Sequence, residues 1–419
     1  MEETQMKGLK AAVLALAATC ASVGGAMAQQ KLTMWSRSSS EAFMPALVKA
    51  FNASHKTQID LQIVPNTEMV QKYAISAAGG SAPDLLSLDL VYTPAFAASG
   101  QLEDLTDLVK GFPFYESLSK AHLGAGTYDG RIYGTPMSAD ASVMLWNKRL
   151  FKQAGLDPEK GPTNWAEIEE YAGKVNAIGG DIRGFYFSGA CGGCNAFTFM
   201  PLVWASGGEI LVDGGKRATL NTPQMRDAAA LYRGLVAKGY VPESARTDPG
   251  ANFFGGFATD RIGMSPIGAF AIGNLVKNYP KVEFGVAFLP GKTGGKASFA
   301  GGDNFVVTAG RKNLPAVREF LTFVYSLEGQ TMLAKLGSLP TRSDIAAEAV
   351  KSLDERYLVA TEAMKIGRTP SSPVYNDIIN SSTGPWKQML NEIFFGNDVE
   401  GSLIKAEKTM QSIIDTSGK

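Results

Sequence analysis

The sequence predicts an α/β protein made of two lobes, each a mostly parallel sheet flanked by helices. Strand-like and helix-like segments alternate over the first hundred residues, the pattern that builds a parallel sheet. About 390 residues remain after a predicted leader, which is long for one hydrophobic core and suggests two. The 46 glycines and the 10% of aromatic residues suit a chain with many tight turns.

Residues 1–28 are predicted to be a secretory signal peptide. Two lysines introduce an apolar stretch over 9–23, and Ala-Met-Ala at 26–28 supplies the small residues that a signal peptidase requires. The stretch is too short to anchor the chain stably in a bilayer. A lipoprotein anchor on Cys20 is not expected, because Thr19 stands where a small Gly or Ala is wanted. The sequence therefore predicts a periplasmic protein.

The charge balance and the scarcity of histidine argue against several classes of function. The chain carries 40 basic and 40 acidic residues, so neither a nucleic acid nor an anionic membrane surface is an expected partner. His55 and His122 are the only histidines, and both lie among polar residues where we expect them to be solvated. Without a cluster of His, Cys or carboxylate ligands, no metal site and no cofactor are predicted.

Predicted strands of the N-terminal region end at polar residues. Trp35-Ser36-Arg37 closes the first strand, and Asp89 closes the third. Because ligands of parallel sheets lie beyond the carboxyl ends of the strands, these residues are predicted to reach a binding site. The predicted strands cover 32–35, 59–64 and 83–88, and the predicted helices between them cover 43–51 and 69–75.

Two extended segments with glycine and proline punctuation are predicted to cross between the lobes. The first runs over 131–147 and the second over 299–307. Between them, Thr163 or Asn164 is predicted to cap a helix, and a buried strand over 261–266 leads into a turn of small residues. The C-terminal part of the chain is predicted to be mostly helical.

Several short motifs follow one another along the chain. They are the opening strand with Trp35, Ala82-Pro83-Asp84-Leu85 before Asp89, Leu102-Glu103-Asp104-Leu105, Tyr133-Gly134-Thr135-Pro136, Leu145-Trp146-Asn147-Lys148, Pro162-Thr163-Asn164-Trp165, Gly301-Gly302-Asp303-Asn304 and Leu339-Pro340-Thr341-Arg342. Each motif is weak alone, but in order and spacing the set resembles the extracellular solute-binding proteins of carbohydrate importers, the family that includes maltose-binding protein. The motifs are specific for that family and not for its ligand.

This resemblance implies a periplasmic-binding-protein fold of type II, with the ligand in a cleft between two lobes. It implies an N-terminal lobe made of 29–138 and 302–336, and a C-terminal lobe made of 139–301 and 337–419. Hinge closure would trap a mono- or disaccharide or a glycoside, and the membrane permease of an ABC importer would recognise the closed form. A monomer is expected.

The chemistry of a sugar selects the candidate ligand-binding residues. A sugar presents a C–H face that packs on aromatic rings and a rim of hydroxyls that bind carboxylate, amide or guanidinium groups. Several candidates also have a structural explanation: the tryptophans as core residues, Asp89 as a helix cap and Gly302 as a hinge turn. The candidates are Trp35, Ser36, Arg37, Asp89, Asp140, Trp204, Gly268, Phe270, Gly302, Asp303, Asn304, Arg342 and Tyr375.

Cys191 and Cys194 are predicted to form a local disulfide, as a pair this close most often does in an oxidising compartment. Zinc would require two further ligands. A redox-active pair would normally open a helix behind a strand, with few glycines around it. The cysteine loop is not a general feature of the resembling family, so the family implies nothing about its conformation.

Two alternatives to a neutral sugar stay open. Arg37 and Arg342 would suit an anionic sugar derivative with a carboxylate, phosphate or sulfonate, because guanidinium groups bind such oxygens well. A receptor for another kind of ligand, coupled to chemosensing, is the second alternative. Catalysis is not expected, since a glycosidase needs two facing carboxylates and no motif pairs Asp89, Asp140 and Asp303.

Overall fold

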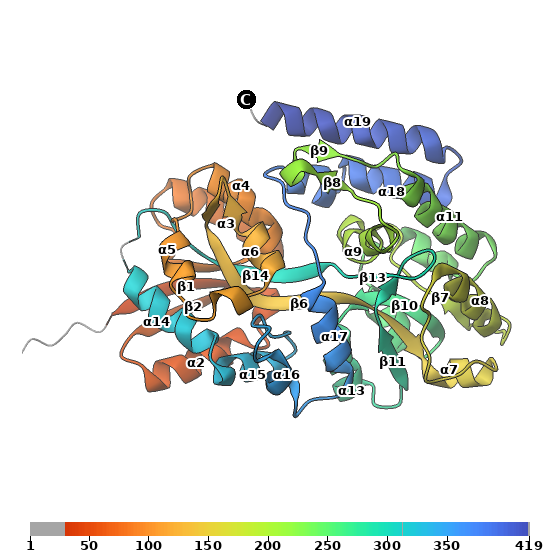
Figure 1. The fold of residues 1–419 in the computed structure, drawn as a ribbon, viewed down its shortest axis with the longest axis horizontal. Helices are drawn as coiled ribbons and strands as arrows, with labels where there is room; N and C mark the ends of the chain where they lie inside the picture. Colours follow the sequence, from red (N-terminus) through yellow and green to blue (C-terminus); the bar gives the residue numbers. More distant parts are fainter. Residues whose placement is uncertain (1–29, 312, 418–419) are drawn as a thin grey trace, which may run out of the picture.

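The computed structural model describes residues 30–311 and 313–417. Within them the chain forms two lobes that lie side by side, with strands running between them through the middle of the molecule (Figure 1). The predicted signal peptide over 1–28 lies outside the described residues. The two-lobed α/β class is as the sequence predicts.

One eight-stranded sheet extends through both lobes. Its strands are β1 (Lys31–Arg37), β2 (Gln58–Val64), β3 (Leu85–Asp89), β6 (Gly134–Asn147), β7 (Arg183–Phe185), β10 (Ile262–Gly268), β11 (Phe284–Ala287) and β14 (Ala300–Val307). Their order is β2-β1-β3-β14-β6-β10-β7, and β11 pairs with β6. Pairing is parallel among β2, β1 and β3 and between β10 and β7, whereas β6 and β14 run antiparallel to their neighbours. The sheet is therefore parallel in its outer parts and antiparallel where the lobes join.

The N-terminal lobe packs its strands between two apolar clusters. Alternation along β1 directs the fully buried Leu32 and Met34 to one cluster and Trp35 to the other. In β3, Leu85 and Leu86 likewise face opposite clusters, which explains the continuous apolar run of a strand buried on both faces. The helices of this lobe are α2 (Met44–Ser54), α3 (Asn66–Ala78), α4 (Thr93–Ala98), α5 (Thr106–Lys110), α6 (Lys120–Ala125), α14 (Leu314–Val324) and α15 (Leu327–Lys335).

The second lobe has one large apolar core, in which Tyr232 and Trp386 are completely buried. Asn164 caps α8 as predicted, because its side chain accepts a hydrogen bond from Glu167 N at 3.0 Å. The remaining helices are α7 (Lys148–Gln153), α8 (Trp165–Asn176), α9 (Gly192–Thr198), α10 (Met200–Ala205), α11 (Pro223–Ala237), α12 (Gly255–Ala258), α13 (Phe270–Asn278), α16 (Ala346–Val350), α17 (Arg356–Lys365), α18 (Pro385–Phe395) and α19 (Val399–Ser417). Three short hairpins complete the fold: β4 (Thr127–Tyr128) with β5 (Arg131–Ile132), β8 (Leu211–Val212) with β9 (Arg217–Ala218), and β12 (Leu289–Pro290) with β13 (Lys296–Ala297).

The strands β6 and β14 carry the chain between the lobes (Figure 1). Their pairing is regular except at one point, where the register shifts between Asp303 and Asn304. Gly302 stands beside this point with φ 120°, and a side chain there would collide with the carbonyl oxygen of Ser138. The lobe boundaries predicted at 138 and 302 lie at this irregularity and stay a prediction.

The sequence-based expectation that His122 is solvated is wrong, because the side chain is fully buried. The ring nitrogens lie 2.9 Å from Ser138 O and 2.9 Å from Ser119 Oγ. The backbone carbonyl of His122 accepts a hydrogen bond from the Asn304 side chain at 3.1 Å. Although the stretch around His122 is polar, α6 packs on both crossing strands, and this packing buries the imidazole.

We expect the pH dependence of unfolding to report this burial. Burial lowers the pKa of His122 to about 4 from its ordinary value of 6.5, and the hydrogen bond with Ser138 opposes the shift. As the pH falls from 6.5 to 4, the unfolded chain takes up a proton that the folded chain does not. The free energy of unfolding therefore falls, by at most about 3 kcal/mol. Urea unfolding of the wild type and of His122→Gln at both ends of this interval measures the effect, and an unchanged pH slope in the variant would contradict it.

Candidate functional site

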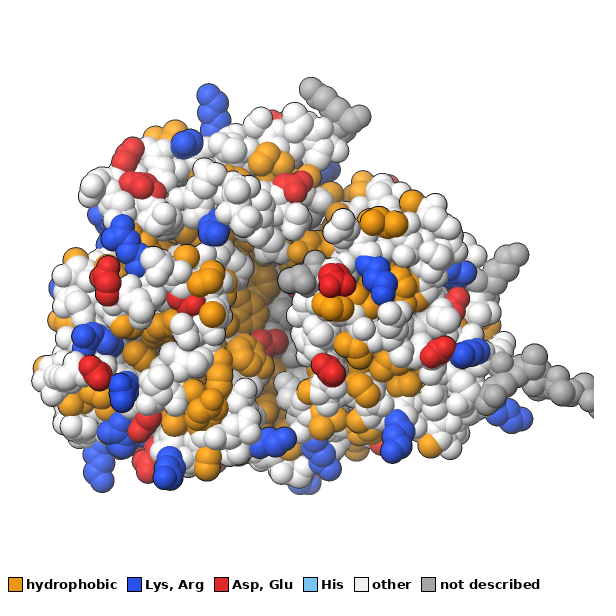
Figure 2. All heavy atoms as spheres, turned by 180° about the vertical axis from the view of Figure 1, so that it is seen from behind, with side chains coloured by type: hydrophobic (Ala, Val, Ile, Leu, Met, Phe, Trp, Pro, Cys, Tyr) orange, Lys and Arg blue, Asp and Glu red, His pale blue; other side chains and the backbone are white. Residues whose placement is uncertain are grey.

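The two lobes enclose a hollow that opens on the face opposite to the one in Figure 1. Figure 2 shows it from behind, with hydrophobic side chains on its walls and acidic side chains at its depth. Along the sheet, β3 is followed by β14 and β6, the strands that pass between the lobes. Side chains at the carboxyl ends of β1 and β3 and on the crossing strands are therefore placed to line the hollow.

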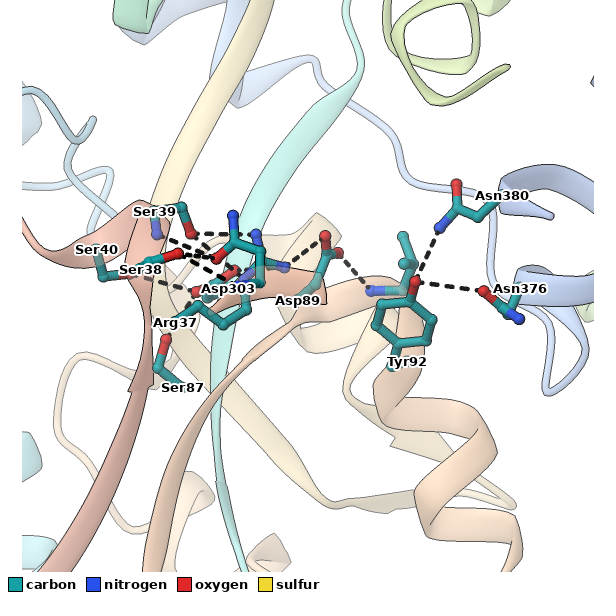
Figure 3. A network of polar contacts seen from close by, with 12 residues as sticks. Arg37, Ser38, Ser39, Ser40, Ser87, Asp89, Tyr92, Asp303, Asn376 and Asn380 are labelled. Carbon is teal, nitrogen blue, oxygen red and sulfur yellow. Dashed lines mark hydrogen bonds and ion pairs between the residues drawn. The ribbon is translucent and has the colours of Figure 1, made fainter. Parts of the chain in front are cut away.

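Arg37, Asp89 and Asp303 form an ion network on the N-terminal wall (Figure 3). The Nη1 atom of Arg37 lies 2.7 Å from Asp89 Oδ2 and 3.4 Å from Asp303 Oδ1. The sheet explains this meeting: Arg37 ends β1, Asp89 ends the neighbouring β3, and β14 places Asp303 directly opposite Asp89. Three of the predicted site residues are thus brought together.

Asp303 is the buried member of the network, with 2% of its surface exposed. Its Oδ2 atom accepts hydrogen bonds from Ser87 Oγ at 2.7 Å and from Ser40 Oγ at 3.4 Å. Burial raises the pKa of Asp303, and the attraction of Arg37 acts in the opposite direction. Three polar side chains therefore hold this one carboxyl: Arg37 of β1, Ser40 of the turn that follows β1, and Ser87 of β3.

Arg37 is engaged before any ligand binds. Burial disfavours its charge, but Asp303 and Asp89 outweigh burial and raise the pKa of Arg37. The Nε and Nη2 atoms of Arg37 also donate to Ser39 Oγ, at 3.3 and 3.2 Å. The guanidinium stays cationic and its charge is already compensated, so the network as a whole carries one net negative charge when both carboxylates are ionised.

Tyr92 links this wall to the second lobe, a contact that the sequence did not predict. Asp89 accepts from Val91 N at 3.3 Å and so also caps the short turn that carries Tyr92. The Tyr92 hydroxyl donates to Asn376 Oδ1 at 3.3 Å and accepts from Asn380 Nδ2 at 3.4 Å (Figure 3). Both asparagines belong to a π-helical turn, η6 (Asn376–Asn380), and such turns are frequent at functional sites.

The wall on the second lobe brings together three further predicted residues. Asp140 lies on β6 opposite Gly301, and its Oδ1 atom accepts a hydrogen bond from Phe270 N at 3.1 Å. Gly268 ends β10 beneath this pair, and a side chain there would collide with Asp140 Oδ2 and lie 2.6 Å from Phe270 Cδ1. Phe270 opens α13 with 38% of its surface exposed, so its ring is available to a ligand.

Two aromatic residues that the sequence analysis missed pack around Phe270. The ring centroids of Phe253 and Phe254 lie 6.3 and 6.4 Å from that of Phe270. They stand in the segment Asn252-Phe253-Phe254-Gly255-Gly256, where two adjacent rings before a glycine pair were the available signal. Together with Phe270 they form an aromatic cluster beside Asp140.

The two candidate tryptophans make other contacts. Trp35 packs against the apolar cluster beneath α3, and the Nζ atom of Lys72 lies 4.3 Å from the centre of its ring. Trp204 is 8% exposed and stacks on Phe299 with ring centroids 5.9 Å apart. The guanidinium carbon of Arg368 lies 4.8 Å from the centre of the Trp204 ring. The structural explanation as core residues accounts for both rings without a ligand.

Three other candidates are buried near the network without exposing a side chain to the hollow. Ser36 is fully buried, and Asn304 is fully buried with its amide donating to His122 O. Tyr375 is 2% exposed and directly precedes η6. Burial raises the pKa of Tyr375, and the nearby charge of Asp89 adds to the effect. Tyr375 therefore lies close to the network although its ring is covered.

The structure does not bring Arg342 to the ion network of Arg37, Asp89 and Asp303. The Nε atom of Arg342 donates to Asp344 at 3.0 Å, its Nη1 atom donates to Tyr325 O at 2.8 Å, and the guanidinium lies 4.1 Å from the centre of the Phe114 ring. Its donors are used within that packing, and it shares no partner with Arg37. The two arginines thus do not form one anion-binding fork.

The predicted disulfide between Cys191 and Cys194 is present. The two cysteines lie at the start of a helix, the position expected of a redox-active pair. Cys191 caps α9, and its sulfur accepts a hydrogen bond from Cys194 N at 3.1 Å. A side chain at Gly250 would lie 3.1 Å from both sulfur atoms. The bridge is therefore packed against the loop that leads to Phe253.

Among residues 30–311 and 313–417, no group of three or more His, Cys, Asp or Glu is placed to hold a metal ion. In the same ranges, no helix combines the length and the apolar character needed to cross a bilayer.

Residues 35–331 match the family of bacterial extracellular solute-binding proteins, and the chain belongs to this family. It is 28% identical to the diacetylchitobiose-binding protein DasA of Streptomyces coelicolor over 88% of this chain and 86% of that one. It is 27% identical to the sn-glycerol-3-phosphate-binding periplasmic protein UgpB of Escherichia coli over 80% of both chains. The cyclic α-maltosyl-1,6-maltose-binding protein of Arthrobacter globiformis superimposes with a TM-score of 0.79 at 25% identity, covering 92% of this chain and 99% of that one. The fold is that of the two-lobed, type II solute-binding proteins.

Removing the arginine of the network is expected to destabilise the protein strongly. Arg37→Met leaves two carboxylates without their cation, one of them buried, and such changes cost about 3–5 kcal/mol. The matched control is Arg131→Met, which breaks an ion pair to Asp104 of similar length, 3.1 Å, but with 66% of the arginine side chain exposed. That change should cost at most about 1 kcal/mol. Urea unfolding at neutral pH measures both, and equal losses would contradict the role assigned to the network.

Proposed function

We propose that this chain is the substrate-binding component of an ABC importer, which captures a mono- or disaccharide or a glycoside in the periplasm and delivers it to the membrane permease. The observation that supports the proposal is a pair of unlike groups, which we propose to face each other across the hollow. One wall presents the Arg37 network, and the other presents Asp140 with the exposed ring of Phe270. A sugar needs polar groups for its hydroxyl rim and a ring for its C–H face.

The strength of such recognition comes from charge-assisted hydrogen bonds. A hydrogen bond to an ionised group contributes about 1.5–3 kcal/mol, and a buried partner left unpaired costs a similar amount. Asp89, whose side chain keeps 31% of its surface exposed, is the carboxylate of the network that a hydroxyl can reach. We propose that Asp89, Asp140 and Phe270 contact the ligand and that Arg37 and Asp303 position Asp89.

The relatives support the proposed class of cargo. DasA is named for diacetylchitobiose, and the structural relative from Arthrobacter globiformis is named for a cyclic maltose derivative. UgpB is named for sn-glycerol-3-phosphate and favours the alternative of an anionic derivative. We rank that alternative second, because the charge of Arg37 is already compensated and Arg342 packs elsewhere. A chemosensing receptor for another ligand has no observation in its favour.

No catalytic role is proposed. The carboxyls of Asp89 and Asp303 share one arginine rather than facing each other across a space for substrate. Capture needs only hinge closure, and we propose that β6 and β14 bend near Gly302 while the two predicted lobes move as bodies. The protein is proposed to act as a monomer.

Binding itself is tested by a thermal-shift panel of mono- and disaccharides, followed by calorimetry on each hit. Asp89→Asn should weaken binding of the best ligand by about tenfold or more, because one charge-assisted acceptor is lost. Asp107→Asn, an exposed carboxylate on α5, is the control and should leave affinity unchanged. If only amino acids or peptides stabilise the protein, the proposed cargo is wrong.

The contact made by Tyr92 provides a separate test of closure. Tyr92→Phe removes the hydroxyl that joins η6 to the N-terminal wall, and each lost hydrogen bond weakens the closed form by about 0.5–1.5 kcal/mol. The two lost bonds together weaken it by about 1–3 kcal/mol, so we expect a roughly 5- to 150-fold rise in the dissociation constant of a bound sugar and a larger radius of gyration in small-angle scattering. Tyr171→Phe, on α8 against Phe151, is the control. Unchanged affinity and size in Tyr92→Phe would show that the contact plays no part in closure.

A further inference from the structure

We propose that Asp140 and the ring of Phe270 form a subsite for a protonated amino group, so that the cargo is a cationic hydroxylated compound such as an amino sugar. The inference rests on the proposed function, because it assigns the charge of the ligand in the same cleft. It is carried by a carboxylate with no cationic partner, an exposed aromatic ring beside that carboxylate, and the sign of the charge on the opposite wall.

The carboxylate of Asp140 lies beside backbone N–H groups and has no cationic side chain as a partner in the described residues. Its Oδ1 atom accepts from Phe270 N at 3.1 Å. Within 30–311 and 313–417, no Lys or Arg forms an ion pair with Asp140. The Oδ2 atom of Asp140 lies against Gly268, so a side chain at position 268 would collide with this oxygen. The absence of a side chain at Gly268 thus leaves room for the carboxylate, whose partners among the described residues are backbone N–H groups rather than a cationic side chain.

Burial also acts on the charge of this carboxyl. It raises the pKa of Asp140 to about 7, although the backbone N–H groups of Phe270, Ala141 and Ala269 oppose the shift. A carboxyl with such a pKa is ionised only in part at neutral pH, because its negative charge is desolvated. An ammonium group bound beside it would restore the ionised form and add an attraction that a hydroxyl cannot supply.

The rings next to Asp140 suit the same group. Phe270 is 38% exposed, and Phe253 and Phe254 surround it with centroid distances of 6.3 and 6.4 Å. The face of an aromatic ring carries partial negative charge and attracts a cation placed over it within about 6 Å. A carboxylate and a ring on one patch therefore form a surface that favours an amine over a neutral hydroxyl or acetamide.

The opposite wall acts in the same direction. Asp89 and Asp303 together exceed the charge of Arg37, the one cation that pairs with them in the described part of the chain. Both walls thus present net negative charge when their carboxylates are ionised, which attracts a cation into the hollow and repels an anion. For the same reason the phosphate of an anionic derivative would find Arg37 already paired with two carboxylates.

The experiment compares ligands that differ only in an amine. Glucosamine and its β-1,4-linked dimer are matched with N-acetylglucosamine and diacetylchitobiose, in which acetylation removes the charge, and calorimetry is run in low salt at a pH that protonates the amine. We expect the amine to bind about tenfold tighter than its acetylated match. Asp140→Asn should abolish this ratio by weakening the amine about tenfold and the acetylated ligand less than threefold. Asp107→Asn removes an exposed charge elsewhere and should keep the ratio.

Each outcome decides the inference. Equal or tighter binding of the acetylated ligands by the wild type, or an equal loss for both ligands in Asp140→Asn, would overturn the amine subsite and leave a sugar-binding protein. Failure of all four compounds and of the wider sugar panel would overturn the proposed function as well. Should Asp140→Asn fail to fold by circular dichroism, Phe270→Leu replaces it. That variant must lower the amine preference at least threefold, and an unchanged preference counts against the proposal.

Discussion

The structure of the cleft depends on one buried arginine that two carboxylates share. Arg37, Asp89 and Asp303 come from three different strands, and their charges compensate one another only when those strands stand in the observed register. A shift of one residue in β14 would turn Asp303 to the other face of the sheet and leave a buried charge unpaired. The ion network therefore fixes the alignment of β1, β3 and β14 at the point where the lobes meet.

This rigid point lies next to the most irregular backbone of the sheet. The register of β14 against β6 shifts immediately after Asp303, and Gly302 adopts a conformation that other residues rarely enter. A hinge needs a few residues that absorb a change in backbone angles while their surroundings stay fixed. The ion network holds the strands next to Gly302 in place, and Gly302 supplies the change in backbone angles that a hinge requires.

The sequence predicted those parts of the site that local pattern controls. Arg37 and Asp89 could be predicted because strands end at these residues. Gly268 and Phe270 could be predicted because a buried strand runs into a turn of small residues. The link from Tyr92 to Asn376 joins positions 284 residues apart and depends on how the lobes meet, which no local pattern encodes. His122 was misjudged, and the separation of Arg342 from Arg37 was missed, for a related reason. A polar neighbourhood in sequence does not tell which face of α6 is covered, or whether a guanidinium already has a partner.

The two walls differ in how far the protein itself satisfies their charges. On the N-terminal wall each charged group of the network already has a partner from the chain, so a ligand there adds its hydrogen bonds to groups that the protein has paired. On the opposite wall Asp140 is held by backbone N–H groups, has no cationic partner among the described residues, and lies against an exposed ring. A binding protein selects its ligand most strongly where its own groups are left incomplete, because the wrong ligand leaves them buried and unpaired. We therefore propose that the second wall, rather than the ion network, is the part of the cleft that decides which compound is carried.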